Sequence, residues 1–309
     1  MKQQQVALTV AGIVVTLFCF LGATSLGPVG AMLNFLTPLP ICYLSMRFGM
    51  RVGFLAVVLV CLLLSLLVPF HSLVAYLGLF GFSSLLLPLL LRRGLAWDSS
   101  VALTVFVVTL AALVFFTTYL LVSGEAPGAL IDQYLQAEIE QAMQVYQGAG
   151  LSDSQLQEME EIARQVADFI RSTFFGLYVA GILTVQLLTL LLLQRFKKDN
   201  YQIAGTPFVA WRLPAPLIWV LILAGFSMLV PQDSLQLVAR NGLAILLPLY
   251  FLQGLAVVNS FLQKKAYPPV LKGMIYLMVF VFNPLPLIVT GVGVFDLWID
   301  FRRPRNKEI

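Results

Sequence analysis

The sequence has few of the residues that build metal sites or nucleophilic centres. Its 309 residues include one histidine, His71, and three cysteines, Cys19, Cys42 and Cys61. One histidine cannot form a multi-histidine metal site. The three thiols lie within apolar segments, where a cysteine acts as a small buried hydrophobic side chain. We therefore expect no metal site, no disulfide and no cofactor.

Enzyme motifs are also missing. No Gly-rich loop ends in Gly-Lys-Ser/Thr, which excludes ATP binding of the P-loop type, and no Gly-x-Ser-x-Gly sequence or Cys/His pair offers a nucleophile. Basic residues form no patch beyond short clusters between apolar segments, which argues against nucleic acid as a partner. The sequence predicts a protein that is not an enzyme.

Charge is the scarcest property of the chain. Charged residues make up 11% of it and hydrophobic residues 60%, whereas a soluble domain is about 25% charged and about 45–50% apolar. Seven stretches contain no Asp, Glu, Lys or Arg: residues 3–46, 52–91, 99–124, 172–194, 213–232, 241–263 and 273–295. A spanning helix needs about 20 apolar residues, so the first two stretches are long enough for helix pairs. The sequence therefore predicts an all-α, polytopic transmembrane helical bundle with about nine segments (8–10), in contact with the lipid bilayer.

Basic residues predict the orientation of this bundle. If each segment crosses once, the basic residues from Lys2 to Lys272 lie on one side, except Arg164, Arg171 and Arg240. The positive-inside rule makes that side the cytoplasm. The basic C-terminal tail lies on the cytoplasmic side only if the last stretch turns back at the interruption Asn283-Pro284-Leu285-Pro286. We expect both termini to be cytoplasmic, because 16 of 19 basic residues then lie on one side.

One soluble insertion divides the chain into three parts: an N-terminal membrane half (1–124), an acidic extracytoplasmic hairpin (125–170) and a C-terminal membrane half with a basic tail (171–309). The insertion holds nine of fifteen acidic residues. Two apolar stripes have helical spacing, and Ser152 with Gln155 matches a capping box. The stripes are Ile131, Leu135, Ile139, Met143 and Tyr146, then Leu156, Met159, Ile162, Ala163, Val166, Phe169 and Ile170. They fit either a solvated hairpin or a lid or docking arm over an outward-facing cavity.

Prolines and lone polar residues mark the candidate binding site. Pro38 and Pro40 disfavour regular helix at the residues before them, and freed backbone groups in a membrane must be buried or line a cavity. The sequence around Pro38 is echoed around Pro284, which fits paired broken helices or simple kinks. We predict Asn34, Thr37, Asn283 and Gln253 as ligand-binding residues. Gln186, Asn241, Gln253 and Asn259 also fit hydrogen bonds between helices.

The late half of the chain resembles the YybS-like family of bacterial membrane proteins of unknown function. The residues that carry this resemblance are Pro207-Phe208, Trp211, Pro214, Arg240-Asn241, Tyr250-Phe251-Leu252-Gln253-Gly254-Leu255-Ala256-Val257 and Asp296-Leu297-Trp298-Ile299-Asp300-Phe301-Arg302. The resemblance covers most of the chain. It implies a multi-pass protein of the bacterial cytoplasmic (inner) membrane.

The first half is similar to the substrate-binding S-components of energy-coupling-factor vitamin transporters. The similarity rests on Thr37-Pro38-Leu39-Pro40 followed by Gly49 and Gly53, and on Ala7 and Ala11, spaced four residues apart. It implies that Ala7 and Ala11 meet an energising or coupling membrane subunit. Extra segments and the acidic insertion depart from the S-component pattern.

Two functions fit these observations. The first is a transport-related component that binds a small molecule, as the resemblance to S-components implies. The alternative is a non-catalytic scaffold or regulatory protein that docks partners through its outer hairpin. A cavity lined by the Pro38 and Pro284 breaks favours the first, and a packed bundle with an exposed outer stripe favours the second.

Overall fold

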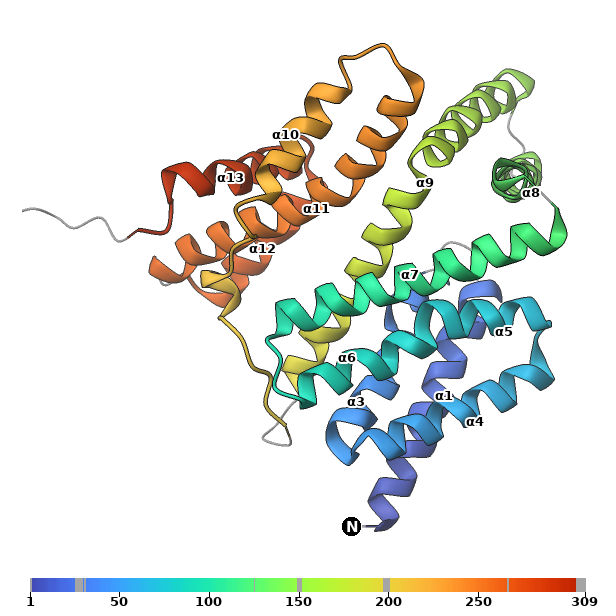
Figure 1. Ribbon diagram of the computed structural model, residues 1–309, viewed down its shortest axis with the longest axis vertical. Coiled ribbons are helices and arrows are strands. Elements are labelled where there is room, and N and C mark those ends of the chain that lie inside the picture. The colour runs from blue at the N-terminus through green and yellow to red at the C-terminus, as the bar shows by residue number, and fades with distance from the viewer. Residues whose placement is uncertain are drawn as a thin grey trace, which may run out of the picture. The chain divides into compact units, whose positions relative to one another are not determined.

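The regular elements of the described chain are all helices, as Figure 1 shows. The computed structural model describes residues 2–25, 30, 32–124, 126–148, 152–196, 201–265 and 267–303. Six helices in this part are long and apolar enough to cross a bilayer, or seven if one bent pair counts as a span. The predicted polytopic all-α bundle is therefore confirmed. The cytoplasmic side of both termini stays a prediction, and residues 304–309 of the basic tail lie outside the described residues.

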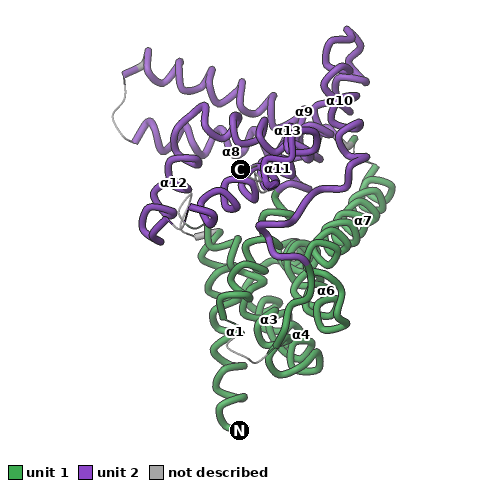
Figure 2. The backbone as a smooth tube through the Cα atoms, turned by 90° about the vertical axis from the view of Figure 1, so that its left-hand side faces the viewer, with its two compact units in different colours: residues 1–126, 181–205 green, residues 127–180, 206–309 purple. Residues whose placement is uncertain are grey.

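The described chain forms two compact units, coloured separately in Figure 2. Unit 1 comprises residues 1–126 and 181–205, and unit 2 comprises residues 127–180 and 206–309. Helix α9 (Asp153–Phe196) therefore contributes to both. The three-part division of the sequence, at residues 124 and 170, stays a prediction.

Unit 1 consists of short and long helices that follow one another closely. They are α1 (Lys2–Ser25), η1 (Met32–Leu36), α3 (Leu39–Phe48), α4 (Met50–Leu67), α5 (Phe70–Tyr76), the π-turn η2 (Leu77–Gly81), α6 (Phe82–Arg92), α7 (Trp97–Ser123) and the end of α9. α3 packs against α1, α4 and α6. It has only ten residues, too few to cross a bilayer alone.

The sequence explains why α3 is so short. Pro38 and Pro40 stand at its start, where proline is tolerated because the first N–H groups of a helix have no partner. Gly49 ends it with a φ of 103°, a conformation that favours glycine. At Gly53 on α4, an added Cβ would lie 1.9 Å from Ser45 Oγ, so a glycine is required for the close approach of α3 and α4.

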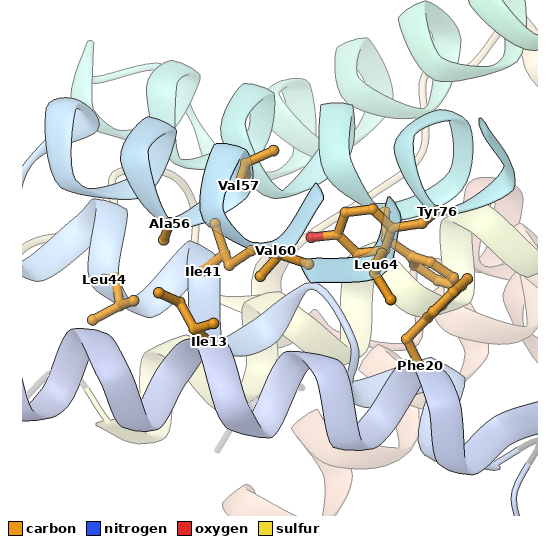
Figure 3. Packing of buried hydrophobic residues seen from close by; sticks show 10 residues of the cluster. Ile13, Phe20, Ile41, Leu44, Ala56, Val57, Val60, Leu64 and Tyr76 are labelled. Carbon is orange, nitrogen blue, oxygen red and sulfur yellow. The ribbon is translucent and has the colours of Figure 1, made fainter. Parts of the chain in front are cut away.

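Buried apolar side chains join these helices in one core, shown in Figure 3. We call it the N-terminal cluster: Ile13, Phe20, Ile41, Leu44, Ala56, Val57, Val60, Leu64, Tyr76 and Phe80. The rings of Phe20 and Tyr76 meet edge to face with centroids 5.3 Å apart. Members come from α1, α3, α4, α5 and η2, so this cluster connects the half-helix α3 to the longer helices around it.

Unit 2 contains the acidic hairpin of the sequence and the late apolar helices. Its elements are α8 (Pro127–Gly148), the first part of α9, η3 (Phe208–Ala210), α10 (Leu217–Ser227), α11 (Asp233–Lys264), α12 (Pro269–Val281) and α13 (Leu285–Ile299). α11 packs against α13 and α10. Two glycines allow the contact between α11 and α13, since an added Cβ would lie 1.9 Å from Val289 O at Gly254 and 2.0 Å from Tyr250 O at Gly293.

Three of the expected membrane segments are not continuous spans. The second is reduced to η1 and α3, and the seventh is the 11-residue helix α10. The last is broken at the predicted proline interruption, where α12 and α13 meet at 102° next to the cis peptide bond Asn283–Pro284. Proline accounts for these interruptions, since it stands at the N-terminal ends of α3, α10 and α13.

Candidate functional site

The predicted site residues of the second segment lie where η1 leads into α3. Thr37 is fully buried, and its hydroxyl donates to Leu33 O over 3.4 Å. Asn34 is half-buried, and its Oδ1 is enclosed without a hydrogen-bond partner among the described residues. η1 packs on α1. The break therefore places one unpaired amide oxygen inside unit 1.

Further unpaired polar atoms occur in unit 1 on α1 and α9. Thr16, Gln186 and Thr189 are each 0% exposed. The hydroxyls of Thr16 and Thr189, and both polar atoms of the Gln186 amide, find no hydrogen-bond partner in the described chain. Buried polar groups are nearly always paired, and an unpaired one costs about 1–3 kcal/mol. Gln186 is thus not the interhelical hydrogen-bonding residue that its position in the sequence indicates.

These groups belong to elements that meet at the N-terminal cluster. Thr16 lies on α1 between the cluster residues Ile13 and Phe20. Val185, which precedes Gln186, packs against the same cluster. Thr189 shares a face of α9 with Gln186, because residues three apart are neighbours on a helix. Sequence reasoning missed Thr16 and Thr189, since a threonine in an apolar segment gives no signal of its own.

Gln253, the other buried predicted amide, is engaged at both ends in unit 2. Its Oε1 accepts from the N–H of Leu213 and its Nε2 donates to Gly293 O, both over 2.9 Å. It therefore joins α11 to α13 and to the segment before α10. Asn283 is exposed at the break between α12 and α13. Asn34 and Thr37 belong to unit 1, whereas Gln253 and Asn283 belong to unit 2.

Asn241 is a second amide that joins helices in unit 2. Its Nδ2 donates to Ser172 O over 2.9 Å, and its Oδ1 accepts from the N–H of Gly176 over 2.7 Å. In a regular helix the Ser172 carbonyl would accept from the Gly176 N–H, so the Asn241 amide bonds to both members of one helical hydrogen-bonding pair. At Gly176 an added Cβ would lie 2.5 Å from Asn241 O, so glycine is needed for the close approach. The predicted interhelical role of Asn241 is confirmed.

A buried carboxylate and two arginines form an ionic cluster at the C-terminal end of α13. Asp296 is 0% exposed, and its Oδ2 accepts from Arg302 Nη2 over 2.8 Å. Arg302 Nη1 donates to the carbonyls of Val209 and Trp211 over 2.9 and 2.7 Å. Arg212 Nε lies 3.8 Å from Asp296 Oδ2. We call these contacts the Arg302 clasp, which holds the chain end on the segment around η3.

Asp300 extends the clasp at its exposed edge. It accepts hydrogen bonds from Arg303 and Arg212 and stands at a φ of 47°. Burial alone would raise the pKa of Asp300, but the hydrogen bonds from the two arginines outweigh it. The pKa of Asp300 therefore lies below its ordinary value of 3.8.

The acidic hairpin keeps part of its apolar surface exposed. The capping box is confirmed, since the Gln155 N–H donates to Ser152 Oγ over 3.4 Å and the Ser152 N–H donates to Gln155 Oε1 over 3.0 Å. The stripe on α8 is mostly half-buried, whereas Ile162, Val166 and Phe169 on α9 are 45%, 50% and 59% exposed. Part of the predicted apolar surface is thus uncovered.

The predicted partner interface lies on the open side of α1. Ala7 and Ala11 are exposed, and Val10 and Val14 beside them are 55% and 57% exposed. This face is free for contact with lipid or with another helix. The role of Ala7 and Ala11 stays a prediction.

Comparison with known protein families gives a match over most of the chain. A family model described as "Predicted membrane protein (DUF2232)" matches residues 12–297. No curated protein and no solved structure matches the chain. Because the match covers most of the sequence, from within α1 to within α13, the chain belongs to this family of predicted membrane proteins.

Proposed function

We propose that the protein is a transport-related membrane component that binds a small polar or amphipathic molecule in unit 1. The observation that carries the proposal is Gln186, a fully buried amide whose oxygen and nitrogen both lack a partner in the described structure. A bound molecule with one acceptor and one donor would satisfy both atoms. That would remove a cost of about 1–3 kcal/mol for each unpaired group.

Three further features support a polar site inside unit 1. Thr16, Thr189 and Asn34 also present unpaired oxygen atoms, and the half-helix α3 supplies a discontinuous element of the kind that transporters use at their sites. The resemblance to S-components that we infer from the sequence supports the proposal; it rests on Thr37-Pro38-Leu39-Pro40, Gly49, Gly53, Ala7 and Ala11. The energising or coupling subunit that such a component needs would meet the exposed face of α1.

Native mass spectrometry of the protein, purified in a mild detergent, tests the proposal. We expect a small-molecule adduct on the wild-type protein and its absence from Gln186→Leu. Thr104→Val is the control, because Thr104 is also 0% exposed in unit 1 but its hydroxyl donates to Ser100 O over 2.7 Å. An adduct that survives Gln186→Leu, or a wild-type protein without any adduct, would contradict binding at Gln186.

The exposed residues Ile162, Val166 and Phe169 favour the second candidate, a scaffold or regulator that docks partners through the hairpin. This function predicts that Val166→Glu abolishes co-purification of a membrane partner and leaves small-molecule adducts unchanged. Glu158→Gln is the control, because Glu158 is an exposed polar residue on the same helix and lies outside the apolar stripe. Equal effects of the two changes would argue against docking through this surface.

A further inference from the structure

An apolar groove crosses unit 1 between α4 and the segment formed by α5, η2 and α6. Its volume is about 440 Å³. The α4 wall includes Phe54, Val58, Leu62 and Ser65. Their spacing of four, four and three residues places them on one face of the helix. The groove thus runs along α4.

The described lining of the groove offers no unpaired polar side chain to a ligand. The opposite wall consists of Leu73, Leu77, Gly81, Phe82 and Leu85, so its side chains are apolar. The hydroxyl of Ser65 already donates to Leu62 O over 2.8 Å. Since α4 is one of the candidate membrane spans, we expect this open apolar groove to face hydrocarbon.

The dimensions of the groove fit one acyl chain. From Phe54 to Ser65, α4 rises about 16 Å, which is half of a hydrocarbon core of about 30 Å. Over that length a volume of about 440 Å³ gives a cross-section of about 27 Å². This length and this cross-section match one acyl chain of one leaflet.

A free positive charge stands at one end of the groove. Arg51 precedes Phe54 by three residues and lies on the same face of α4. It is exposed and forms no hydrogen bond or salt bridge with the described residues. It is in the first turn of α4, where the helix dipole also favours an anion. Side chains of a helix point toward its N-terminus, so the guanidinium reaches away from the groove toward the membrane surface.

We propose that this groove and Arg51 form a binding site for one anionic phospholipid. Its phosphate pairs with Arg51 at the start of α4, and one acyl chain lies along Phe54, Val58 and Leu62. The site uses neither Gln186 nor Thr16, so it stands or falls independently of the proposed function.

Native mass spectrometry with two lipids tests the head-group contact. The purified protein is incubated with equal amounts of phosphatidylglycerol and phosphatidylcholine that carry identical chains. One arginine near the membrane surface is expected to favour the anionic lipid about fivefold. Arg51→Gln should reduce the preference to near one. Arg195→Gln, an exposed basic position on α9, should leave it unchanged. A preference that persists in Arg51→Gln would overturn the site.

Substitutions that fill the groove test its contact with the acyl chain of the lipid. Val58→Trp should remove the retained adduct of both lipids, whereas Leu59→Trp should keep it. The two positions are 38% and 36% exposed, and only Val58 lines the groove. Leu62→Trp, at a lining position that is 58% exposed, repeats the test if Val58→Trp does not fold. Equal adducts on the groove-filling and control variants would overturn the proposal.

Discussion

The buried amide of Gln186, unpaired in the described structure, leads us to predict that its replacement by leucine increases the stability of the protein. Replacing a buried, hydrogen-bonded glutamine with leucine destabilises a protein, because its former partners are left unpaired. Gln186 has no such partners among the described residues. Gln186→Leu should therefore raise the stability of the unliganded protein by about 1–3 kcal/mol, the cost of burying one unpaired polar group. For a chain of this size that corresponds to an increase in Tm of roughly 2–6 °C.

Gln253→Leu should do the opposite. The substitution removes two hydrogen bonds of 2.9 Å and leaves the N–H of Leu213 and the carbonyl of Gly293 unpaired. Each orphaned group costs about 1–3 kcal/mol, so a loss of about 2–6 kcal/mol is expected. Gln186 and Gln253 are 0% and 3% exposed, which makes the two substitutions closely comparable.

Thermal unfolding in detergent measures both effects. A ligand present at 100 times its Kd would add about 2.7 kcal/mol to the wild-type protein and nothing to Gln186→Leu. Ligand stripping should therefore lower the Tm of the wild type and leave that of Gln186→Leu unchanged. If Gln186→Leu lowers the Tm of the stripped protein as Gln253→Leu does, Gln186 has a structural partner and the reasoning is refuted.

Other contacts give predictions for unit 2. Arg302→Lys should lower stability by about 1–3 kcal/mol in thermal unfolding, because a lysine cannot donate to two carbonyls and a carboxylate in the same planar geometry; an unchanged Tm would contradict this. Since the pKa of Asp300 is lowered, its contribution to stability is complete above its ordinary pKa and is lost as the pH falls through the folded-state value; the Tm of Asp300→Asn should depend less on pH below about 4 than that of the wild type. Asn241→Leu should increase amide hydrogen exchange at Gly176, which loses its acceptor; unchanged exchange would show that the helix bond replaces it. Gly293→Leu should disrupt the contact between α11 and α13 and lower the yield of folded protein, whereas an unaffected yield would mean that the backbones can separate.

Uncharged stretches and prolines predicted much of the fold. The membrane class follows from hydrophobic length alone, and the break before α13 follows from Pro284 and Pro286. The capping box at Ser152 was also visible, because its two residues bond to each other locally. In each case the signal and the structure that it produces lie within a few residues.

The partners of the tertiary contacts escaped prediction because they are distant in the sequence, even where an interhelical role was expected, as for Asn241. Arg302 lies 91 residues from Trp211, whose carbonyl it contacts. The length of α3 depends on Gly49 as well as on Pro38, and α9 continues from the hairpin into the membrane segment, although the charge boundary at residue 171 indicated two elements. Nothing in the sequence separates the paired amide of Gln253 from the unpaired amide of Gln186.

The interleaving of the two units constrains how the chain can fold during synthesis. Unit 1 takes residues 1–126 and 181–205, and unit 2 takes the residues between and after them. The N-terminal helices must therefore wait for α8 and the first part of α9 to be made before residues 181–205 can complete unit 1. A cut between Gly148 and Ser152 would leave neither fragment with a complete unit. Co-expressed halves would have to assemble with each other before either could finish folding.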